Sequence, residues 1–378
     1  MREISDIKAA VVGTGFIGVV HVEALRRLGV EVAGIVGSTA ERAAEKAKAA
    51  GLPAPYPSFE AMLADPAVEV VHLTTPNRLH FEQARAALAA GKHVVCEKPL
   101  GMDSTETAEL VRLADESGLV HAVNFNIRFY AQCQEARRRV QAGEIGDVRL
   151  ITGGYLQDWL LLDTDWNWRL DPAEGGSLRA VGDIGSHWLD LVQFVTGRRV
   201  EAVMADLTTF IPVRKQPTGP VETFSSGGAG ETVDTPMETE DAAGILLRLS
   251  GGARAVMTVS QVSAGRKNRL SWEIDGAEAA LAWHSEAPEE LWIGHRERPN
   301  ERLLREAGDY PPGHAEGFPD TFKHLYRAVY RAVASGGPPP EPDYPTFADG
   351  HDEAVIGDAI ARSHAEQRWV NVAPVTVP

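Results

Sequence analysis

Short apolar segments alternate with helical patterns over the first third of the chain. The apolar segments lie at residues 9–12, 30–36, 68–73, 93–96 and 119–125. Between them, apolar residues recur at helical spacing, and strands that alternate with helices predict a parallel sheet with helices on both faces. We therefore expect residues 1–126 to form a doubly wound α/β domain.

The pattern changes to strand-like segments from residue 148 onward. These segments lie at residues 148–155, 200–207, 243–249, 253–261 and 270–274. Alternation over 255–259 is typical of a sheet with two different faces. Residues 127–378 are therefore predicted to form a second domain of the α+β class. Residues 213–239 are rich in Pro, Gly, Ser and Thr and lack apolar periodicity, so we expect a long mobile loop there.

Composition narrows the class of protein. The 378 residues carry a formal net charge of −16 and 44% hydrophobic residues, which is typical of a soluble globular protein. The acidic balance argues against nucleic-acid and anionic-membrane partners, because phosphates attract concentrated positive charge. Cys96 and Cys133 cannot form a disulfide framework. The first apolar segment is too short for a signal-peptide core or a membrane span, and we expect a cytoplasmic protein.

A glycine-rich turn follows the first predicted strand. Gly13, Gly15 and Gly18 form the pattern GxGxxG between a strand and a helix. In that context the glycines allow a tight turn and a close approach of the backbone to a pyrophosphate, which the helix N-terminus then binds. We predict a dinucleotide-binding Rossmann domain in which Phe16 and Ile17 also contact the coenzyme. The alternative is a turn that serves packing only.

The end of the second predicted strand lacks an expected acid. A carboxylate about 20 residues beyond the glycines usually binds the ribose hydroxyls of NAD, but this chain has Gly37, Ser38 and Thr39 there. Ser38 and Thr39 can donate hydrogen bonds, and Arg42 can pair with a phosphate. The sequence therefore indicates an NAD(P) coenzyme with NADP favoured over NAD. The alternative for Arg42 is a solvated helix residue.

Polar residues follow the next two strands. Thr75, Pro76 and Asn77, with His80 one turn later, follow the segment 68–73. Glu97 and Lys98 follow the segment 93–96, and Pro99 restricts the backbone of Lys98. Ligands of open α/β sheets bind at such strand ends. A lysine here can hold a substrate hydroxyl and favour its ionised form, although most loop lysines are simply solvated.

A second set of ionisable residues lies at helical spacing. In a helix that begins near Asp183, the residues Asp183, His187 and Asp190 share one face, with Gly175 and Gly176 just upstream. Imidazole titrates closest to neutrality, and a carboxylate can orient it. The stretch therefore predicts a proton-transfer site. The alternative is a surface helix with an ordinary acid/histidine pair.

An aromatic-rich segment lies between the first two strands of the second domain. It contains Trp159, Trp166, Trp168 and Arg169. Aromatic faces stack on the C–H faces of sugars, and Gln157, Asp158 and Arg169 can bind hydroxyls. For any single tryptophan, packing is the simpler interpretation.

The order and spacing of these motifs resemble the Gfo/Idh/MocA family of oxidoreductases. The motifs that carry the resemblance are Gly13-x-Gly15-x-x-Gly18, Thr75-Pro76-Asn77-x-x-His80, Glu97-Lys98-Pro99 and Gly-Gly-x6-Asp183-x3-His187-x2-Asp190. The resemblance implies a C-terminal domain with an open, largely antiparallel sheet, a homodimer or homotetramer, and Lys98, Asp183 and His187 as the catalytic group. It also implies that Arg169 lies near the coenzyme. The stretch from Tyr155 through Gln157 to Trp159 is similar to levoglucosan dehydrogenase-like members and is expected to bind substrate.

Together these features predict an NAD(P)-dependent dehydrogenase that acts on a secondary alcohol of a sugar, anhydrosugar or cyclitol. We expect six residues of the strand-end motifs to lie beside the coenzyme: Thr75, Pro76, Asn77, His80, Glu97 and Lys98. The proposed reaction requires no metal. Lys98, Asp183 and His187 would also bind the substrate. One alternative is an NAD-dependent glycosidase that oxidises its sugar transiently, and another is a non-catalytic sugar-sensing protein.

Overall fold

The protein, seen in a computed structural model, divides into two compact units. The structure describes residues 2–53, 55–219, 230–306, 308–311 and 313–373. Unit 1 comprises the described residues of 2–126 and 318–354, and unit 2 those of 127–317 and 355–373. No helix in the described part of the chain is long and apolar enough to cross a membrane.

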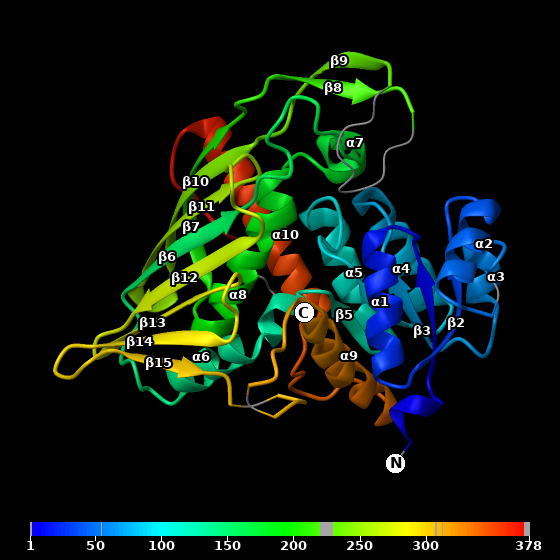
Figure 1. The fold of residues 1–378 in the computed structure, drawn as a ribbon, viewed down its shortest axis with the longest axis horizontal. Helices are drawn as coiled ribbons and strands as arrows, with labels where there is room; N and C mark the ends of the chain where they lie inside the picture. The colour runs from blue at the N-terminus through cyan, green and yellow to red at the C-terminus, as the bar shows by residue number, and fades with distance from the viewer. Residues whose placement is uncertain (1, 54, 220–229, 307, 312, 374–378) are drawn as a thin grey trace. The chain divides into compact units, whose positions relative to one another are not determined.

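Unit 1 is built on the predicted parallel sheet (Figure 1). Its strands, in the order β2-β1-β3-β4-β5, are β2 (Glu31–Val36), β1 (Lys8–Val12), β3 (Val70–Leu73), β4 (His93–Cys96) and β5 (His121–Val123). All four neighbouring pairs are parallel. The strand order reverses between β1 and β3, which is where ligands bind in sheets of this type.

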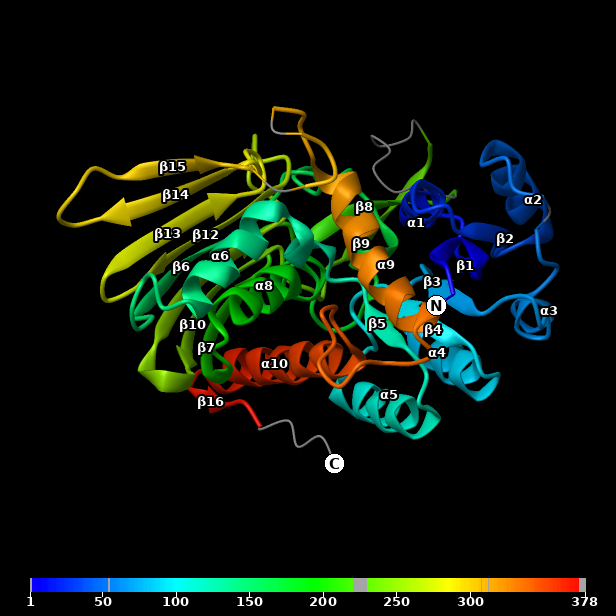
Figure 2. The ribbon, with the colours of Figure 1, turned by 90° about the horizontal axis from the view of Figure 1, so that it is seen from below.

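Helices cover both faces of this sheet. They are α1 (Phe16–Arg27), α2 (Ala40–Ala49), α3 (Phe59–Leu63), α4 (His80–Ala89), α5 (Ser104–Ser117), α9 (Phe318–Ala334) and the first turns of α10 (Phe347–Glu366), with short 3-10 turns η1 (Ile4–Asp6) and η2 (Asn77–Leu79). Figure 2 shows α4 and α5 on one face and α1 and α9 on the other. The prediction of a doubly wound Rossmann domain is confirmed.

The sequence analysis assigns α9 to the second domain, but the structure groups residues 318–354 with unit 1. Phe322, Tyr326 and Tyr330 recur at helical spacing and are at most 1% exposed. They pack beside His21 of α1 and His72 of β3. The helix α9 thus completes one face of the sheet, although it begins nearly 200 residues after the first part of unit 1 ends. The order of elements along the chain does not predict that the chain comes back to this sheet.

Unit 2 contains a nine-stranded mixed sheet that is largely antiparallel. Its strands, in spatial order, are β15 (Glu301–Leu304), β14 (Glu290–His295), β13 (Ala279–His284), β12 (Arg269–Asp275), β6 (Leu150–Leu156), β11 (Arg254–Ser260), β10 (Ala242–Leu249), β7 (Val200–Thr208) and β16 (Val370–Asn371). Only the β6–β11 pair among these described strands is parallel. The α+β domain implied by the resemblance is confirmed.

One face of this sheet forms the core of unit 2. It is covered by α6 (Ala131–Gln141), α8 (Ser186–Thr196) and the second part of α10, which contribute Cys133, Trp188 and Ile360 to one apolar cluster with the sheet (Figure 2). The short helical turns of this unit are η3 (Asn126–Phe129), η4 (Trp168–Leu170), α7 (Pro172–Gly175), η5 (Val181–Gly185) and η6 (Ser250–Gly252).

The prediction of a mobile loop at residues 213–239 is wrong at both ends of this range, where the structure has strands. The strands β8 (Val213–Pro217) and β9 (Thr232–Pro236) pair as an antiparallel hairpin, while residues 220–229 lie outside the described residues. Arg214 of β8 is fully buried and donates to Asp241 and to the carbonyl oxygen of Leu162, 2.8 Å away in each case. A buried arginine anchors the hairpin where the sequence pattern shows only turn-forming residues.

Candidate functional site

The three glycines of the turn after β1 differ in the space around them. Gly13 has φ +120°, and a Cβ there would lie 2.4 Å from Thr74 Oγ1. A Cβ on Gly18 would lie 2.4 Å from the carbonyl oxygen of Gly13. A Cβ on Gly15, which precedes the first residue of α1, would meet nothing within 4 Å. Gly13 and Gly18 therefore permit close packing, and Gly15 leaves open space at a helix N-terminus, which fits a pyrophosphate.

The other two predicted residues of the turn are accessible. Phe16 is 53% exposed and Ile17 is half-buried. An exposed aromatic ring directly after the open glycine fits a contact with the coenzyme, which stays a prediction.

The segment that follows β2 contains the polar, exposed residues Ser38 and Thr39, and residues 37–40 include no carboxylate. Thr39 caps α2, because its Oγ1 accepts the N–H of Arg42 at 3.2 Å. Ser38, Thr39 and Arg42 are all exposed. A Cβ on Gly37 would lie 2.9 Å from the backbone N of Ala43. Glycine at 37 therefore allows α2 to approach the strand end closely.

His80 joins the loops that follow β3 and β4. Its side chain is fully buried, with Nε2 2.9 Å from the carbonyl oxygen of Thr75 and Nδ1 2.7 Å from that of Pro99. Burial lowers the pKa of His80. Asn77 is buried nearby, and Thr75 Oγ1 donates to Gln83 over 2.7 Å. The geometry gives His80 a structural part in fixing these loops, and its predicted contact with the coenzyme stays a prediction.

Glu97 is also held inside unit 1. It is 7% exposed and accepts from His21 Nε2 at 3.0 Å and from Asn124 Nδ2 at 2.6 Å. Its other oxygen lies 3.2 Å from the backbone N of Lys98, and the peptide bond between Lys98 and Pro99 is cis. The sequence analysis missed His21 and Asn124, although a histidine on the buried face of a helix is a detectable signal.

Asp183 lies in a π-helical turn, η5, that runs into α8. Its two carboxylate oxygens have separate donors, because Arg169 Nε lies 3.0 Å from Oδ1 and Gln261 Nε2 lies 2.9 Å from Oδ2. The structure thus places Arg169 on Asp183, and its predicted position near the coenzyme stays a prediction. Gln261 was missed, because only the register of β11 brings it here.

His187 lies one turn beyond Asp183, beside Tyr155 of β6. Their ring centroids are 6.2 Å apart with 56° between the planes. Burial raises the pKa of the Tyr155 hydroxyl well above its usual range, which disfavours this residue as a proton acceptor. Asp190, on the same helix, binds Arg128, whose Nε lies 2.8 Å from Oδ2. Asp190 therefore forms an ion pair that gives it a structural role. It also shares the helix with His187, as the spacing predicts.

Three of the residues predicted to bind substrate form one hydrogen-bonded group with Asn268. Tyr155 donates its hydroxyl to Asn268 Oδ1 at 2.6 Å, and Gln157 Nε2 donates to the same oxygen at 2.8 Å. Trp159 Nε1 donates to Gln157 Oε1 at 2.9 Å. We call these four residues the polar platform. Asn268 was missed, because it lies more than 100 residues away in sequence.

A buried charge cluster stands behind Asp183. Arg179 Nη1 donates to Gln261 Oε1 at 3.3 Å, and Arg179 also pairs with Asp241, which pairs in turn with Arg214. All three charged side chains of this cluster are fully buried. Because such a network resists rearrangement, it fixes the orientation of Gln261 and through it that of Asp183.

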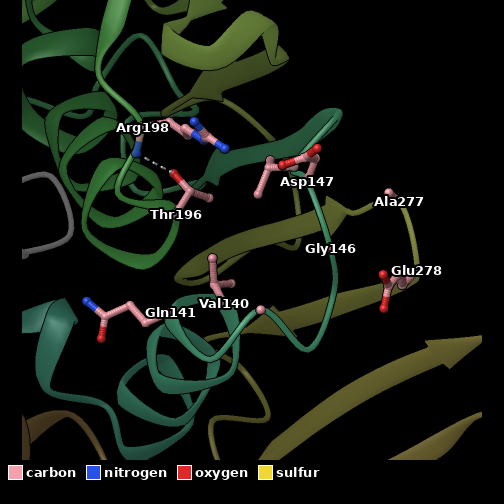
Figure 3. A pocket seen from close by; sticks show the side chains of 10 residues that line it. Val140, Gln141, Gly146, Asp147, Thr196, Arg198, Ala277 and Glu278 are labelled. Carbon is pink, nitrogen blue, oxygen red and sulfur yellow. Dashed lines mark hydrogen bonds between the residues drawn. The ribbon is translucent and has the colours of Figure 1, made fainter.

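A surface pocket of about 490 Å³ lies elsewhere in unit 2 (Figure 3). Val140, Gln141, Asp147, Thr196, Arg198 and Glu278 are among the residues that line it. It shares no residue with the predicted site. The predicted coenzyme-binding residues of the first domain, including Lys98, lie in unit 1, and Asp183, His187 and the polar platform lie in unit 2.

Comparison with known proteins matches both units. A model described as the oxidoreductase family with an NAD-binding Rossmann fold matches residues 7–125, and a model of the GFO/IDH/MocA C-terminal domain matches residues 133–282. Levoglucosan dehydrogenase of Pseudarthrobacter phenanthrenivorans is 29% identical to this chain. The match spans 99% of this chain and 100% of that protein. D-xylose 1-dehydrogenase (NADP(+)) 2 of Haloferax volcanii is 30% identical over 70% of this chain and 80% of its own.

Solved structures agree with these matches. A levoglucosan dehydrogenase in complex with NADH and levoglucosan has a TM-score of 0.87 at 29% identity, over 98% of this chain and 100% of that one. The likeness extends over both units, so the fold is shared along nearly the whole chain.

Proposed function

Because the chain belongs to the Gfo/Idh/MocA family of oxidoreductases, we propose that it transfers a hydride between NAD(P) and a secondary alcohol of a sugar, anhydrosugar or cyclitol. The observation that carries the proposal is the doubly held carboxylate of Asp183, one helical turn before His187. The names of the relatives, which are sugar dehydrogenases, support the same reaction class.

The proposed roles follow from the chemistry of each side chain. A bound coenzyme supplies the hydride acceptor of the oxidation. Gly15 and the N-terminus of α1 would hold its pyrophosphate. His187 would take the proton of the substrate hydroxyl, and Asp183 would orient the substrate and stabilise the charged imidazole. Lys98 would bind the same oxygen and stabilise its developing negative charge.

The polar platform would recognise the sugar. Its hydrogen bonds hold Gln157 and Asn268 in one orientation, so their remaining donors and acceptors are preorganised for hydroxyls. Trp159 is half-buried, with its ring N–H already bound to Gln157, and its ring face suits the C–H face of a pyranose.

For the coenzyme we propose that NADP is favoured over NAD. The support is the exposed group of Ser38, Thr39 and Arg42, with no acid at residues 37–40 to repel a 2′-phosphate. One relative carries NADP(+) in its name, while solved neighbours contain NADH, so both coenzymes occur among similar proteins.

We further propose that the open face of the nine-stranded sheet joins subunits into a homodimer or homotetramer. Leu246 and Val256 face each other across β10 and β11 on this side and are 45% and 41% exposed. Apolar side chains on an uncovered sheet face favour burial against another copy. Light scattering should give a mass of at least twice 40.8 kDa. A cytoplasmic location stays a prediction.

A substrate screen tests the proposed reaction. The purified enzyme is incubated with pyranosides, anhydrosugars and inositols and with each coenzyme, and absorbance at 340 nm is recorded. We expect coenzyme-dependent oxidation of at least one of these alcohols. Hydrolysis of a glycoside without net absorbance change would support the glycosidase instead, and tight sugar binding without turnover would support the sensing protein.

A further inference from the structure

Four buried side chains of unit 1 form a continuous hydrogen-bonded chain, which we call the histidine relay. The Tyr330 hydroxyl of α9 lies 3.0 Å from His72 Nε2, and His72 Nδ1 lies 3.0 Å from His21 Nδ1. His21 Nε2 then lies 3.0 Å from Glu97 Oε1. Tyr330, His72 and His21 are fully buried and Glu97 is 7% exposed.

The contact between the two Nδ1 atoms restricts the protons of the relay. Only one proton can lie between them, so one ring must donate and the other must accept. With Glu97 ionised, His21 donates from Nε2 and accepts at Nδ1, His72 donates from Nδ1, and Tyr330 donates to His72 Nε2. Both histidines are then neutral. Every contact is satisfied and the relay carries one charge, on Glu97, which is the least costly arrangement in a buried site.

The relay ends directly beside Lys98. Glu97 Oε1 also accepts from Asn124, and Oε2 lies 3.2 Å from the backbone N of Lys98. The carboxylate therefore has a fixed orientation, with one oxygen on the relay and the other on the Lys98 backbone.

The surroundings of the relay are mostly neutral. Burial lowers the pKa of His72 well below its usual range, which fits a neutral ring. The charge of Glu97 raises the pKa of His80 and that of Lys98 lowers it. The charge of Glu69 raises the pKa of Tyr330. Cys96, Phe322 and Tyr326 also pack around the relay.

We propose that His21 and His72 are positioning residues for Lys98, which hold Glu97 as an ordered carboxylate on the Lys98 backbone. The proposal rests on the catalytic role given to Lys98 above. It explains why two polar rings occupy a β-strand and a helix face that are otherwise apolar. A fixed backbone at Lys98 limits where its side chain can start, which helps to place the amine for the stabilisation of an alkoxide.

The proton arrangement can be measured in the wild-type protein. In the full-length protein labelled with 15N-histidine, nitrogen chemical shifts report the tautomer of each ring, and single histidine substitutions assign the signals. We expect His21 to be neutral with its proton on Nε2 and His72 to be neutral with its proton on Nδ1. A doubly protonated His21, or a His72 protonated on Nε2, would overturn the proposed relay.

The effect on Lys98 is tested with His21→Leu and His21→Gln. Leucine removes the donor to Glu97, whereas glutamine can place an amide N–H where Nε2 was. The probe is trace acetic anhydride, and the rate at which Lys98 is labelled at one fixed pH is followed by mass spectrometry. For His21→Leu we expect the labelling rate of Lys98 to change about threefold or more, because the carboxylate no longer holds its backbone in one place, and kcat to fall about tenfold. His21→Gln should restore most of both.

The labelling needs no substrate, so the two proposals can fail separately. A changed labelling rate of Lys98 in His21→Leu, in a protein that oxidises no alcohol, would contradict the proposed function and support the relay. An active enzyme in which the folded His21→Leu variant labels Lys98 at the wild-type rate would contradict the relay only. A comparison of circular dichroism and coenzyme affinity with the wild type shows whether the variant is folded, and the tautomer measurement tests the relay if it is not.

Discussion

Gln261, the residue after β11, donates from Nε2 to Asp183 Oδ2 over 2.9 Å. Gln261 is fully buried and its Oε1 is held by Arg179, so the amide cannot turn without breaking a bond on each side. Asp183 therefore presents its carboxylate in one orientation before any substrate binds. Such preorganisation avoids reorganisation when charge develops during the reaction.

The contact predicts a kinetic role for Gln261. Gln261→Met keeps the length of the side chain and removes both hydrogen bonds. A lost bond to a charged group costs about 1.5–3 kcal/mol, so kcat should fall about 10- to 100-fold. Coenzyme affinity, measured by fluorescence titration, should be unchanged. A variant that is folded and has wild-type kcat would show that Asp183 does not need this donor.

Substitution of Arg169 distinguishes two roles for this residue. The structure places it on Asp183, and the family resemblance implies that it lies near the coenzyme. If it acts through Asp183, Arg169→Met should lower kcat about tenfold or more and leave the Kd of the coenzyme unchanged. If it binds the coenzyme, as the resemblance implies, the Kd should rise instead. Arg169→Lys is the matched control, because it keeps the charge but loses the planar guanidinium.

His187→Ala tests the proton acceptor. We expect kcat to fall by about 10²- to 10⁴-fold, the usual contribution of a positioned base, with little change in coenzyme affinity. The rise of the oxidation rate with pH should lose one titration step. An unchanged rate and pH profile would exclude His187 and leave Lys98 as the base, because burial raises the pKa of Tyr155.

The coenzyme preference is tested at Ser38. Gly37 is a poor position for an acid, because a side chain there would collide with the backbone of Ala43. Ser38 is exposed, so Ser38→Asp can place a carboxylate near the adenosine ribose. It should weaken NADP relative to NAD by about 1–3 kcal/mol, while Ser38→Asn, which is neutral and of the same size, should not. Tighter binding of NAD than of NADP by the wild type would contradict the predicted preference.

His121 predicts a loss of stability in acid. Burial lowers its pKa from 6.5 to about 4, and its Nδ1 accepts the N–H of Phe347 at 3.2 Å, which requires the neutral ring. The unfolded chain therefore binds this proton below about pH 6.5, whereas the folded protein binds it only near pH 4. The free energy of unfolding should fall across this interval by up to about 3 kcal/mol.

Urea unfolding at pH 7 and pH 4.5 checks this expectation. In His121→Asn the side-chain oxygen can still accept from Phe347 but does not titrate, so the difference between the two pH values should shrink. An equal difference in both proteins would assign the acid sensitivity to other groups.

The sequence by itself determined the features that depend on local pattern. Strand and helix periodicity predicted the parallel sheet of residues 1–126 and most strands of the second sheet, because burial imposes a period on each element. The glycine turn, the strand-end motifs with Lys98, and the spacing of Asp183 and His187 were also visible, since each is set by neighbours in the chain. The family resemblance then supplied the expected reaction.

Only the tertiary structure decided which distant residues hold these groups. Gln261 meets Asp183 through the register of β11, and Asn268 meets Tyr155 through the β6–β12 pair. Tyr330 reaches His72 because α9 returns to the first sheet across 258 residues. No local pattern encodes these contacts, because they arise from packing between elements far apart in sequence.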